Sequence, residues 1–399
     1  MSKNVTEKRE RYNKIPHRAK EDTEKCMKTK STISVKSVRN LKPLISNFSV
    51  FVPHSSALCY NLPMKKTVFA LLFAFFAFSA FSLSQNFTYK TYSLTAYYPE
   101  TVQPGDAVFV RLVFEATGKK ASKELIESTE RGELAIFKAG NDGTLAEKAT
   151  AKSQFYKIEK TASKKSVKAV LLSGAPLSSW AKAGEYSAEV SFSAFGEEHK
   201  ISLPIKIIEK EFVSETIPLN ASNTAIKTNV SKERMDQINR LNKILDTKNP
   251  TAVYEPSSFA PPTPATRRTS FFADRRVYAY SNGKSSTSLH YGIDYGVPTG
   301  SEVRSCGRGK VVMAEDRIST GWSVCIEHLP GLYSLYYHMS ELQVEVGQTV
   351  KQGDLIGLSG ATGLATGPHL HWEVRLNMEA VSPDFFVSDF TFEKESKKR

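Results

Sequence analysis

The histidines of this 399-residue chain are concentrated in one stretch. Six lie beyond residue 85, and five of these fall between His290 and His371. Two belong to the motif HLH, which ends at His371, and a third opens the motif HYGID, which ends at Asp294. In extended backbone, residues two or four apart lie on the same side of the strand. The spacing therefore predicts that His369 and His371, and likewise His290 and Asp294, can converge on one point.

Two imidazoles and one carboxylate form a normal ligand set for catalytic zinc, with the fourth position left to water. Such an ion lowers the pKa of the water and polarises a carbonyl group. A site with four protein ligands would be closed and structural, so this chemistry needs three of the four candidates and leaves one His near the substrate. Gly292 removes a side chain that would crowd the site. His338 supplies a further imidazole that could stabilise an oxyanion or transfer a proton.

The elements that must position these residues are short strands separated by glycines. This pattern predicts an antiparallel β domain from 265 to 388, followed by a charged tail at 389–399. Its predicted strands cover 275–280, 300–306, 309–315, 322–328, 332–338, 354–360 and 369–376.

Two further units are expected before this domain. Residues 86–211 alternate apolar and polar residues in short runs between turn signals, which predicts a β-sandwich of immunoglobulin-like type. A packing or positioning role is expected for it, with a cell-wall or partner-binding role as the alternative. Residues 212–264 are expected to form a helix and a Pro-rich linker. The helix is predicted from Ser231, as N-cap, to Asp246, because apolar residues recur there at three- and four-residue spacing.

The basic character of the chain lies in its N-terminal part. The formal net charge is +13, but residues 1–63 carry +8 and everything from Thr67 onward only +3, so no nucleic-acid partner is expected. Residues 64–84 combine two lysines, an apolar run and small residues, which is typical of a signal peptide with cleavage after Ser82 or Ser84. Residues 1–63 are then interpreted as a leader upstream of the true start. Alternatively, the run is an uncleaved anchor with a basic cytoplasmic tail. In both interpretations, the chain after about residue 85 is exported to the periplasm or the cell exterior. Anchoring in the inner membrane is the less favoured of the two.

Residues from about Phe272 to Pro383 resemble the catalytic domain of the lysostaphin/LytM-type metallopeptidases. The matching text is HYGIDYGVPTGSEV, GRGKVV, GLYSLYYHMSEL and VGQTVKQGDLIGLSGATGLATGPHLHWEV. The resemblance implies that His290, Asp294 and His371 bind one Zn²⁺ per chain, and that His338 and His369 are catalytic residues outside the ligand set. One departure is Ala273, where the family usually has Gly.

The function implied by the resemblance is a zinc endopeptidase that hydrolyses peptide bonds in peptidoglycan stem or cross-link peptides. A non-catalytic wall-binding or amidase-activating module would be expected to lack at least one ligand, whereas this sequence keeps all three. A glycyl-glycine lysin is a further alternative, although it would usually carry a wall-targeting domain after the peptidase.

Other residues near the motifs are given structural roles. His328 is expected in a hairpin, and Tyr336, Tyr337 and Trp372 in the core or the groove wall. Asp316, Glu327 and Glu373 are expected to be solvated or structural, with orientation of His371 as an alternative for Glu373. Cys306 and Cys325 could pair in an oxidising compartment, but two separate buried thiols are favoured.

Overall fold

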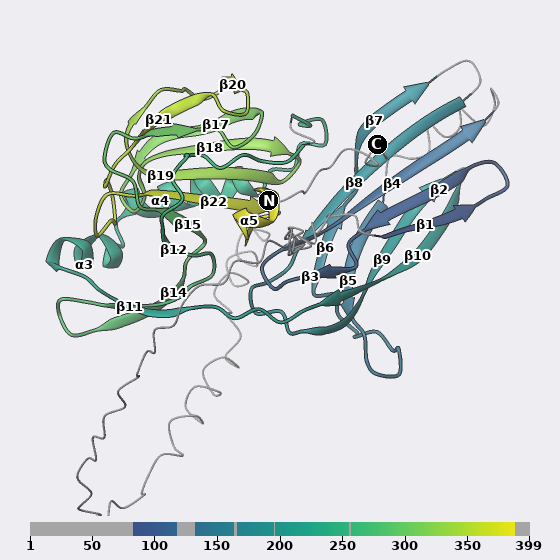
Figure 1. Ribbon diagram of the computed structural model, residues 1–399, viewed down its shortest axis with the longest axis horizontal. Coiled ribbons are helices and arrows are strands. Elements are labelled where there is room, and N and C mark those ends of the chain that lie inside the picture. Colours follow the sequence, from purple (N-terminus) through teal and green to yellow (C-terminus); the bar gives the residue numbers. More distant parts are fainter. Residues whose placement is uncertain (1–82, 118–131, 163–165, 195, 255–256, 388–399) are drawn as a thin grey trace, which may run out of the picture. The chain divides into compact units, whose positions relative to one another are not determined.

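The computed structural model describes residues 83–117, 132–162, 166–194, 196–254 and 257–387, and these are mostly β (Figure 1). The predicted leader, most of the predicted signal peptide and the charged tail lie outside these ranges. All described residues belong to one compact unit. Within those ranges, no helix is both long and apolar enough to span a membrane.

Two five-stranded sheets form the first part of the described chain. One has the strand order β1-β2-β4-β8-β7 and the other β3-β10-β9-β5-β6. Their strands are β1 (Leu83–Thr88), β2 (Ser93–Tyr98), β3 (Thr101–Val102), β4 (Ala107–Thr117), β5 (Gly132–Lys138), β6 (Ala151–Gln154), β7 (Tyr156–Ala162), β8 (Ser166–Pro176), β9 (Gly184–Ala194) and β10 (Glu197–Ile207).

The two sheets share one apolar core, to which Leu94, Phe114, Phe192 and Leu203 each contribute a fully or almost fully buried side chain. The alternation in β9 and β10 places every second residue in this core, as the sequence pattern predicts. A β-sandwich is thus observed, and its immunoglobulin-like type stays a prediction. Strand β1 includes Leu83 and Ser84, so cleavage after Ser82 would leave this strand whole.

A ten-stranded sheet forms the second part, and the candidate site residues lie on its strands or directly before them. Its main path is β12-β15-β22-β19-β18-β17-β20, and β16, β21 and β23 pair beside it. Its strands are β12 (Arg268–Ser270), β15 (Gly292–Tyr295), β16 (Glu302–Arg304), β17 (Gly309–Arg317), β18 (Gly321–Leu329), β19 (Leu332–Leu342), β20 (Thr349–Val350), β21 (Leu355–Ser359), β22 (Leu370–Leu376) and β23 (Glu379–Val381). Helix α5 (Pro383–Val387) follows.

A small three-stranded sheet and two helices complete the second part. The sheet has the order β11-β13-β14, with β11 (Ser214–Pro218) parallel to β13 (Arg275–Ala279) and β14 (Ser285–Leu289) antiparallel to it. Helix α3 (Ala221–Thr228) was not predicted from the sequence. Helix α4 (Lys232–Leu245) confirms the predicted helix, and the Ser231 side chain caps it by accepting a hydrogen bond from the Arg234 N–H.

The Pro-rich segment packs on the second part instead of crossing solvent. Phe259 is 3% exposed and its ring lies 5.3 Å from that of Phe386. Backbone hydrogen bonds join Ala260 to Cys306 and Arg304 to Pro262. Burial of the apolar ring and hydrogen bonding of the backbone groups stabilise the packing of this proline-containing stretch, even without regular secondary structure. The predicted domain boundaries themselves stay predictions.

Candidate metal centre

The β15–β22 ladder brings the HYGID and HLH motifs together. Asp294 on β15 lies directly opposite His371 on β22 in this antiparallel pair. His290 comes just before β15, and its backbone N–H donates to Asp274 O while its carbonyl accepts from Ala273 N. His290, Asp294 and His371 are all buried, at 3%, 7% and 7% exposure. Ordinary strand pairing therefore places two imidazoles and a carboxylate in a protected position.

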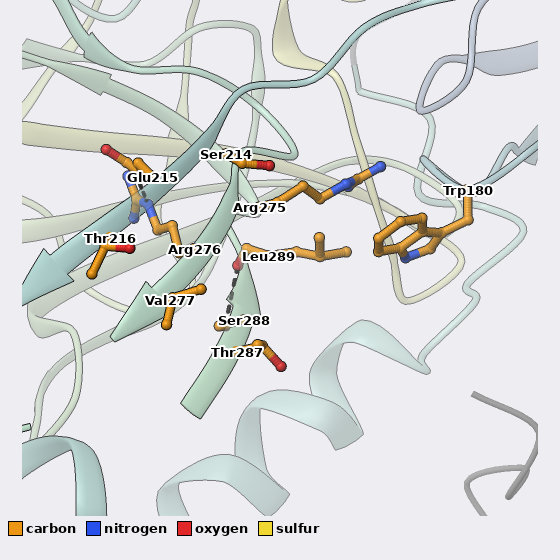
Figure 2. Close-up of a pocket in the computed structure, with 10 residues that line it drawn as sticks. All are labelled: Trp180, Ser214, Glu215, Thr216, Arg275, Arg276, Val277, Thr287, Ser288 and Leu289. Atoms are coloured by element: carbon orange, nitrogen blue, oxygen red, sulfur yellow. Dashed lines mark hydrogen bonds and ion pairs between the residues drawn. The ribbon is translucent and has the colours of Figure 1, made fainter. Parts of the chain in front are cut away.

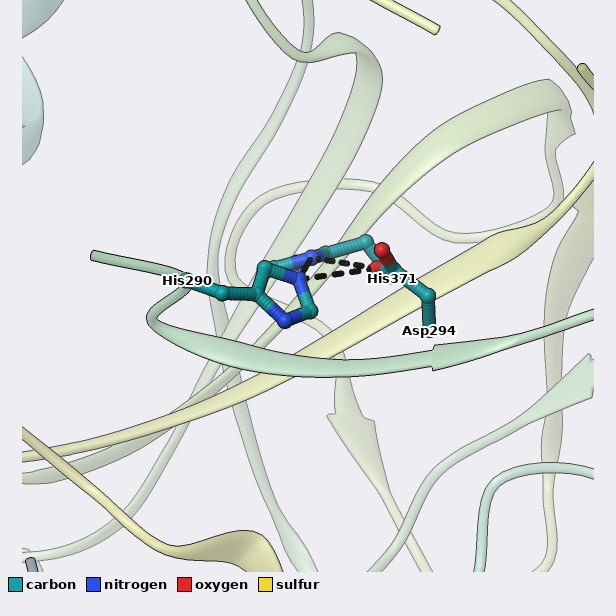
Figure 3. A group of neighbouring side chains, drawn as sticks. All are labelled: His290, Asp294 and His371. Carbon is teal, nitrogen blue, oxygen red and sulfur yellow. Dashed lines mark hydrogen bonds and ion pairs between the residues drawn. The ribbon is translucent and has the colours of Figure 1, made fainter. Parts of the chain in front are cut away.

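Three ligand atoms of these residues form a tight triangle (Figure 3). His290 Nε2 lies 3.0 Å from Asp294 Oδ1 and 2.9 Å from His371 Nδ1, and His371 Nδ1 lies 2.8 Å from Asp294 Oδ1. The predicted fourth candidate, His369, stands further off, with its Nε2 3.8 Å from Asp294 Oδ1. Of the four candidates, the structure thus groups the three that the family resemblance implies as ligands.

The imidazoles of His290 and His371 each form a hydrogen bond on the side away from the triangle, and this bond decides which ring nitrogen carries a lone pair. His290 Nδ1 lies 2.8 Å from the carbonyl oxygen of Phe271, which can only accept, so Nδ1 carries the hydrogen and Nε2 does not. His371 Nε2 lies 3.2 Å from a carboxylate oxygen of Glu373 and by the same reasoning is the donor. Three electron-rich atoms therefore face one another, and this arrangement is stable only with a cation among them.

A proton can be that cation as well as a metal ion. Burial opposes charge on His371, but the hydrogen bonds to Asp294 and Glu373 prevail and raise its pKa to about 9. Burial likewise opposes charge on Asp294, but the two adjacent imidazoles hold the pKa of its carboxyl well below the usual value. The field at this point is therefore negative and attracts a positive ion.

The triangle also fits a metal ion by size and donor type. A tetrahedral ion with bonds of about 2.0–2.1 Å separates its ligand atoms by about 3.3 Å, and the three distances here are only a few tenths of an ångström shorter. Neutral imidazole and carboxylate are ordinary zinc ligands, and each ring has the outer hydrogen bond that fixes a metal-binding tautomer. The residues present therefore fit a three-ligand zinc site with an open position.

His338 owes its direction to an irregularity in β19. This strand pairs with β22 as far as Tyr337 and with β21 from Met339 onward, so His338 stands where the partner changes. Its backbone φ is +62°, in the left-handed region that few residues other than glycine adopt. Such departures from regular strand geometry are common next to active sites, where they redirect a side chain. No sequence signal indicates this one.

His338 and His369 are held by backbone carbonyls in the same way as His290. His338 Nδ1 donates to Thr362 O at 2.7 Å, and His369 Nδ1 donates to Gly367 O at 2.8 Å. Each ring therefore keeps Nε2 free as a proton acceptor, and the two ring centroids are 4.7 Å apart. Burial and the neighbouring histidines lower the pKa of His338 to about 3, so this ring is neutral at physiological pH.

All five residues line one groove with a volume of about 720 Å³. Tyr337 forms part of its wall and stacks on His371, with ring centroids 5.2 Å apart and an interplanar angle of 11°. Trp372 and Tyr336 are fully buried core residues, and His328 is buried with its Nδ1 donating to Arg308 O. The structural roles predicted for these four residues are therefore confirmed. Cys306 and Cys325 are both buried and are not joined in a disulfide, as favoured from the sequence.

A buried arginine ties the metal centre to β11. Arg276 Nη2 donates to Asp294 Oδ2 at 3.1 Å, and Arg276 Nε donates to Glu215 Oε1 at 2.8 Å. Glu215 and Arg276 also line a second cavity of about 440 Å³, where Trp180 stacks on Arg275 with 3.7 Å from Cζ to the ring centroid (Figure 2). The sequence does not predict the part played by Glu215 and Arg276, because no spacing links β11 to β15.

Two expectations for residues beside the ligands can be compared directly with the structure. Glu373 is 2% exposed and accepts a hydrogen bond from His371, which agrees with the alternative expectation that it orients that ring. A Cβ atom on Gly292 would lie 2.3 Å from Trp372 O and 2.8 Å from His371 Nε2, which confirms that a side chain there would crowd the site. Ala273 takes a φ of +63°, so it adopts a backbone conformation that glycine favours.

Two imidazoles, a carboxylate and an open groove in a β-sheet define a metal-dependent hydrolase site. Residues 288–383 match the family model described as Peptidase family M23, so the C-terminal part of the chain is a domain of that family. The "Peptidoglycan DD-endopeptidase ShyA" of Vibrio cholerae is 32% identical over 169 residues, which are 42% of this chain and 38% of that protein.

Other relatives match over a shorter stretch. The "DD-carboxypeptidase/endopeptidase Mpg" of Neisseria gonorrhoeae is 41% identical over 95 residues, 24% of this chain and 22% of that protein. The solved structure of the antimicrobial peptidase lysostaphin from Staphylococcus simulans is 33% identical, with a TM-score of 0.24, and the match covers 27% of this chain and 48% of that one. The chain spans less than half the length of each of these relatives.

Proposed function

We propose that this protein is a zinc-dependent endopeptidase that hydrolyses amide bonds in the peptide cross-links of peptidoglycan. The observation that carries the proposal is the convergence of three lone pairs, from His290, Asp294 and His371, beside two further imidazoles in an open groove. The names of the V. cholerae and N. gonorrhoeae relatives, a peptidoglycan DD-endopeptidase and a DD-carboxypeptidase/endopeptidase, support peptidoglycan as the substrate. Action on that substrate also supports the predicted export to the periplasm or cell exterior.

His290 Nε2, Asp294 Oδ1 and His371 Nδ1 would hold the ion. When bound, zinc would act as a Lewis acid toward a carbonyl oxygen and lower the pKa of a water molecule. The protein's own contribution before any reaction is to keep both imidazoles in the binding tautomer, through Phe271 O and Glu373.

His338 and His369 are suited to move the proton that hydrolysis transfers. Because each ring donates its Nδ1–H to a carbonyl, its Nε2 can accept a proton from the attacking water. As water adds to the carbonyl carbon and the C–N bond breaks, the protonated ring can stabilise the oxyanion and then give the proton to the leaving amine.

Digestion of purified peptidoglycan tests the proposal. The purified protein, with and without a chelator, is incubated with sacculi beside His371→Ala, and the muropeptides are separated by chromatography. His199→Gln, on β10 and outside the groove, is the matched control. We expect cross-linked dimers to become monomers only with metal-loaded protein that keeps His371, and the product masses to identify the bond. Intact sacculi after treatment with protein that holds one zinc per chain would refute the proposed substrate.

A further inference from the structure

Helix α3 contributes one residue to the lining of the groove and is attached on two sides. Asn223 Nδ2 donates to Ala365 O at 3.1 Å, in the loop that leads to His369. On the other side, Thr224 Oγ1 accepts from Ser281 N at 3.1 Å, in the turn between β13 and β14. The helix lies before residues 288–383, the range that the family model covers. It therefore adds to the groove a fixed surface that the family match does not include.

Lys227 is the residue of α3 that lines the groove together with His338 and His369. It is half-buried, and its Nζ lies 4.2 Å from the ring centroid of Tyr278, which also lines the groove. Burial, followed by Arg234 and Arg276, lowers the pKa of Lys227, so the ammonium group is placed where its charge is costly. A lysine in the last turn does complement the helix dipole, but that interaction needs no burial against an aromatic ring.

The carboxylates that line the groove are all engaged elsewhere. Glu215 pairs with Arg276, Asp294 with Arg276 and the imidazoles, and Glu373 with His371 and Arg375. Across the described residues, no carboxylate forms an ion pair with Lys227. A cation that is half-desolvated, held over a ring and lacking an internal counter-charge is well suited to an anion supplied from outside.

We propose that Lys227 and Tyr278 form a carboxylate-binding subsite, which takes a free carboxylate of the peptide substrate next to the scissile amide. This inference rests on the proposed function and adds a specificity determinant to it. The carboxylate can belong to the C-terminus of the peptide strand or to a side chain, and both present the same planar anion to the ammonium group. The chemistry requires only that this group be ionised and not amidated.

The test compares substrates and variants in one matrix. Three cross-linked peptides are used: one with all carboxylates free, one amidated at the C-terminus and one amidated at the side chain. The enzymes are the wild type, Lys227→Met, Lys227→Arg and, as a control with the same charge change, Lys232→Met. Lys232 is an exposed residue of α4 that pairs with Asp236 and does not line the groove.

We expect the wild type to cleave the free peptide with a kcat/KM about tenfold higher than that of one of the two amidated peptides, and the difference should lie in KM. The amidated peptide that is cleaved less well identifies which carboxylate the subsite binds. Lys227→Met should reduce this preference to within twofold, Lys227→Arg should keep most of it, and Lys232→Met all of it. Zinc content should be one per chain in each variant. Unchanged discrimination in Lys227→Met, or none in the wild type, would overturn the subsite.

A binding measurement separates this inference from the proposed function. Calorimetry with the same peptides and chelator-treated wild type or Lys227→Met requires no cleavage. If the wild type binds the free peptide preferentially and Lys227→Met does not, the subsite is supported, even if none of the peptides is cut. Absence of cleavage would reject only the endopeptidase activity. Cleavage of all three peptides at equal rates by both proteins would reject only the subsite.

Discussion

Replacing Glu373 by glutamine should weaken zinc binding without unfolding the site. Glu373 is buried, accepts the Nε2–H of His371 with one carboxylate oxygen and contacts Arg375 with the other. Glutamine keeps the shape and can still accept that hydrogen, but it removes the negative charge that makes the His371 ring more basic. The substitution therefore acts on the strength of one ligand and not on its identity.

The expected size follows from this geometry. Loss of an outer carboxylate partner of a metal-binding histidine typically costs 10- to 100-fold in affinity, which corresponds to about 1.4–2.7 kcal/mol. We expect the upper half of that range, because Glu373 is 2% exposed and water cannot replace its charge. The pKa of His371 should also fall in metal-free protein, since Glu373 is, after Asp294, one of the two groups that raise it.

The assay is competition for zinc against a chromophoric chelator near neutral pH. Glu327→Gln is the matched control, because Glu327 is also a buried carboxylate, bonded to Tyr333 on the neighbouring strand and absent from the groove. Its zinc affinity should stay within twofold of the wild type. An equal loss in both variants, or a loss below threefold in Glu373→Gln, would refute the reasoning. Circular dichroism should show both proteins folded.

Three further predictions concern other parts of the structure. Gly292→Ala should lose zinc and about 3 kcal/mol of stability, because the new Cβ would overlap Trp372 O and the His371 ring; metal analysis and urea unfolding check this, and normal zinc content would contradict it. His338→Gln should lower kcat by about 10²- to 10³-fold while zinc content stays at one per chain, since His338 is outside the ligand triangle; loss of zinc would instead show a structural role. Asp106→Asn should stabilise the protein by about 3 kcal/mol near pH 8 and not near pH 4. Burial raises the Asp106 pKa to about 6 from an ordinary 3.8, so the stability that the protonated group contributes below pH 4 is lost as pH rises through 6. Asparagine can still accept the hydrogen bond from the Gln103 N–H. Thermal melts at both pH values check this prediction, and an equal shift in Tm at pH 4 and pH 8 would contradict the raised pKa of Asp106.

Much of the site follows from local sequence, because strand geometry is local. The even spacing within HYGID and HLH puts the ligands on common faces, and the alternation in β9 and β10 gives their buried faces. The N-cap at Ser231 is likewise a short-range signal, and the helix begins after it.

The remainder depends on contacts between distant segments. Glu215 and Arg276 meet only because β11 pairs in parallel with β13 across 61 residues of sequence. Helix α3 is short and has few apolar residues, so its periodicity gives no signal, and it is held by Ala365 and Ser281 from remote loops. The bulge at His338 depends on β19 having two different partners, β22 and β21. Neither pairing can be read from the residues around His338.

The main-chain anchoring of the histidine rings has a consequence for how this site can tolerate change. Phe271, Thr362 and Gly367 fix the tautomers of His290, His338 and His369 through carbonyl oxygens, which every amino acid possesses. Substitution of those three residues can leave the hydrogen bonds in place as long as the backbone path is kept. Only His371 relies on a side chain, that of Glu373. Among the groups that orient the four rings, only Glu373 should therefore be sensitive to point substitution. Insertions and deletions in the loops of Phe271, Thr362 and Gly367 should disturb the other three rings.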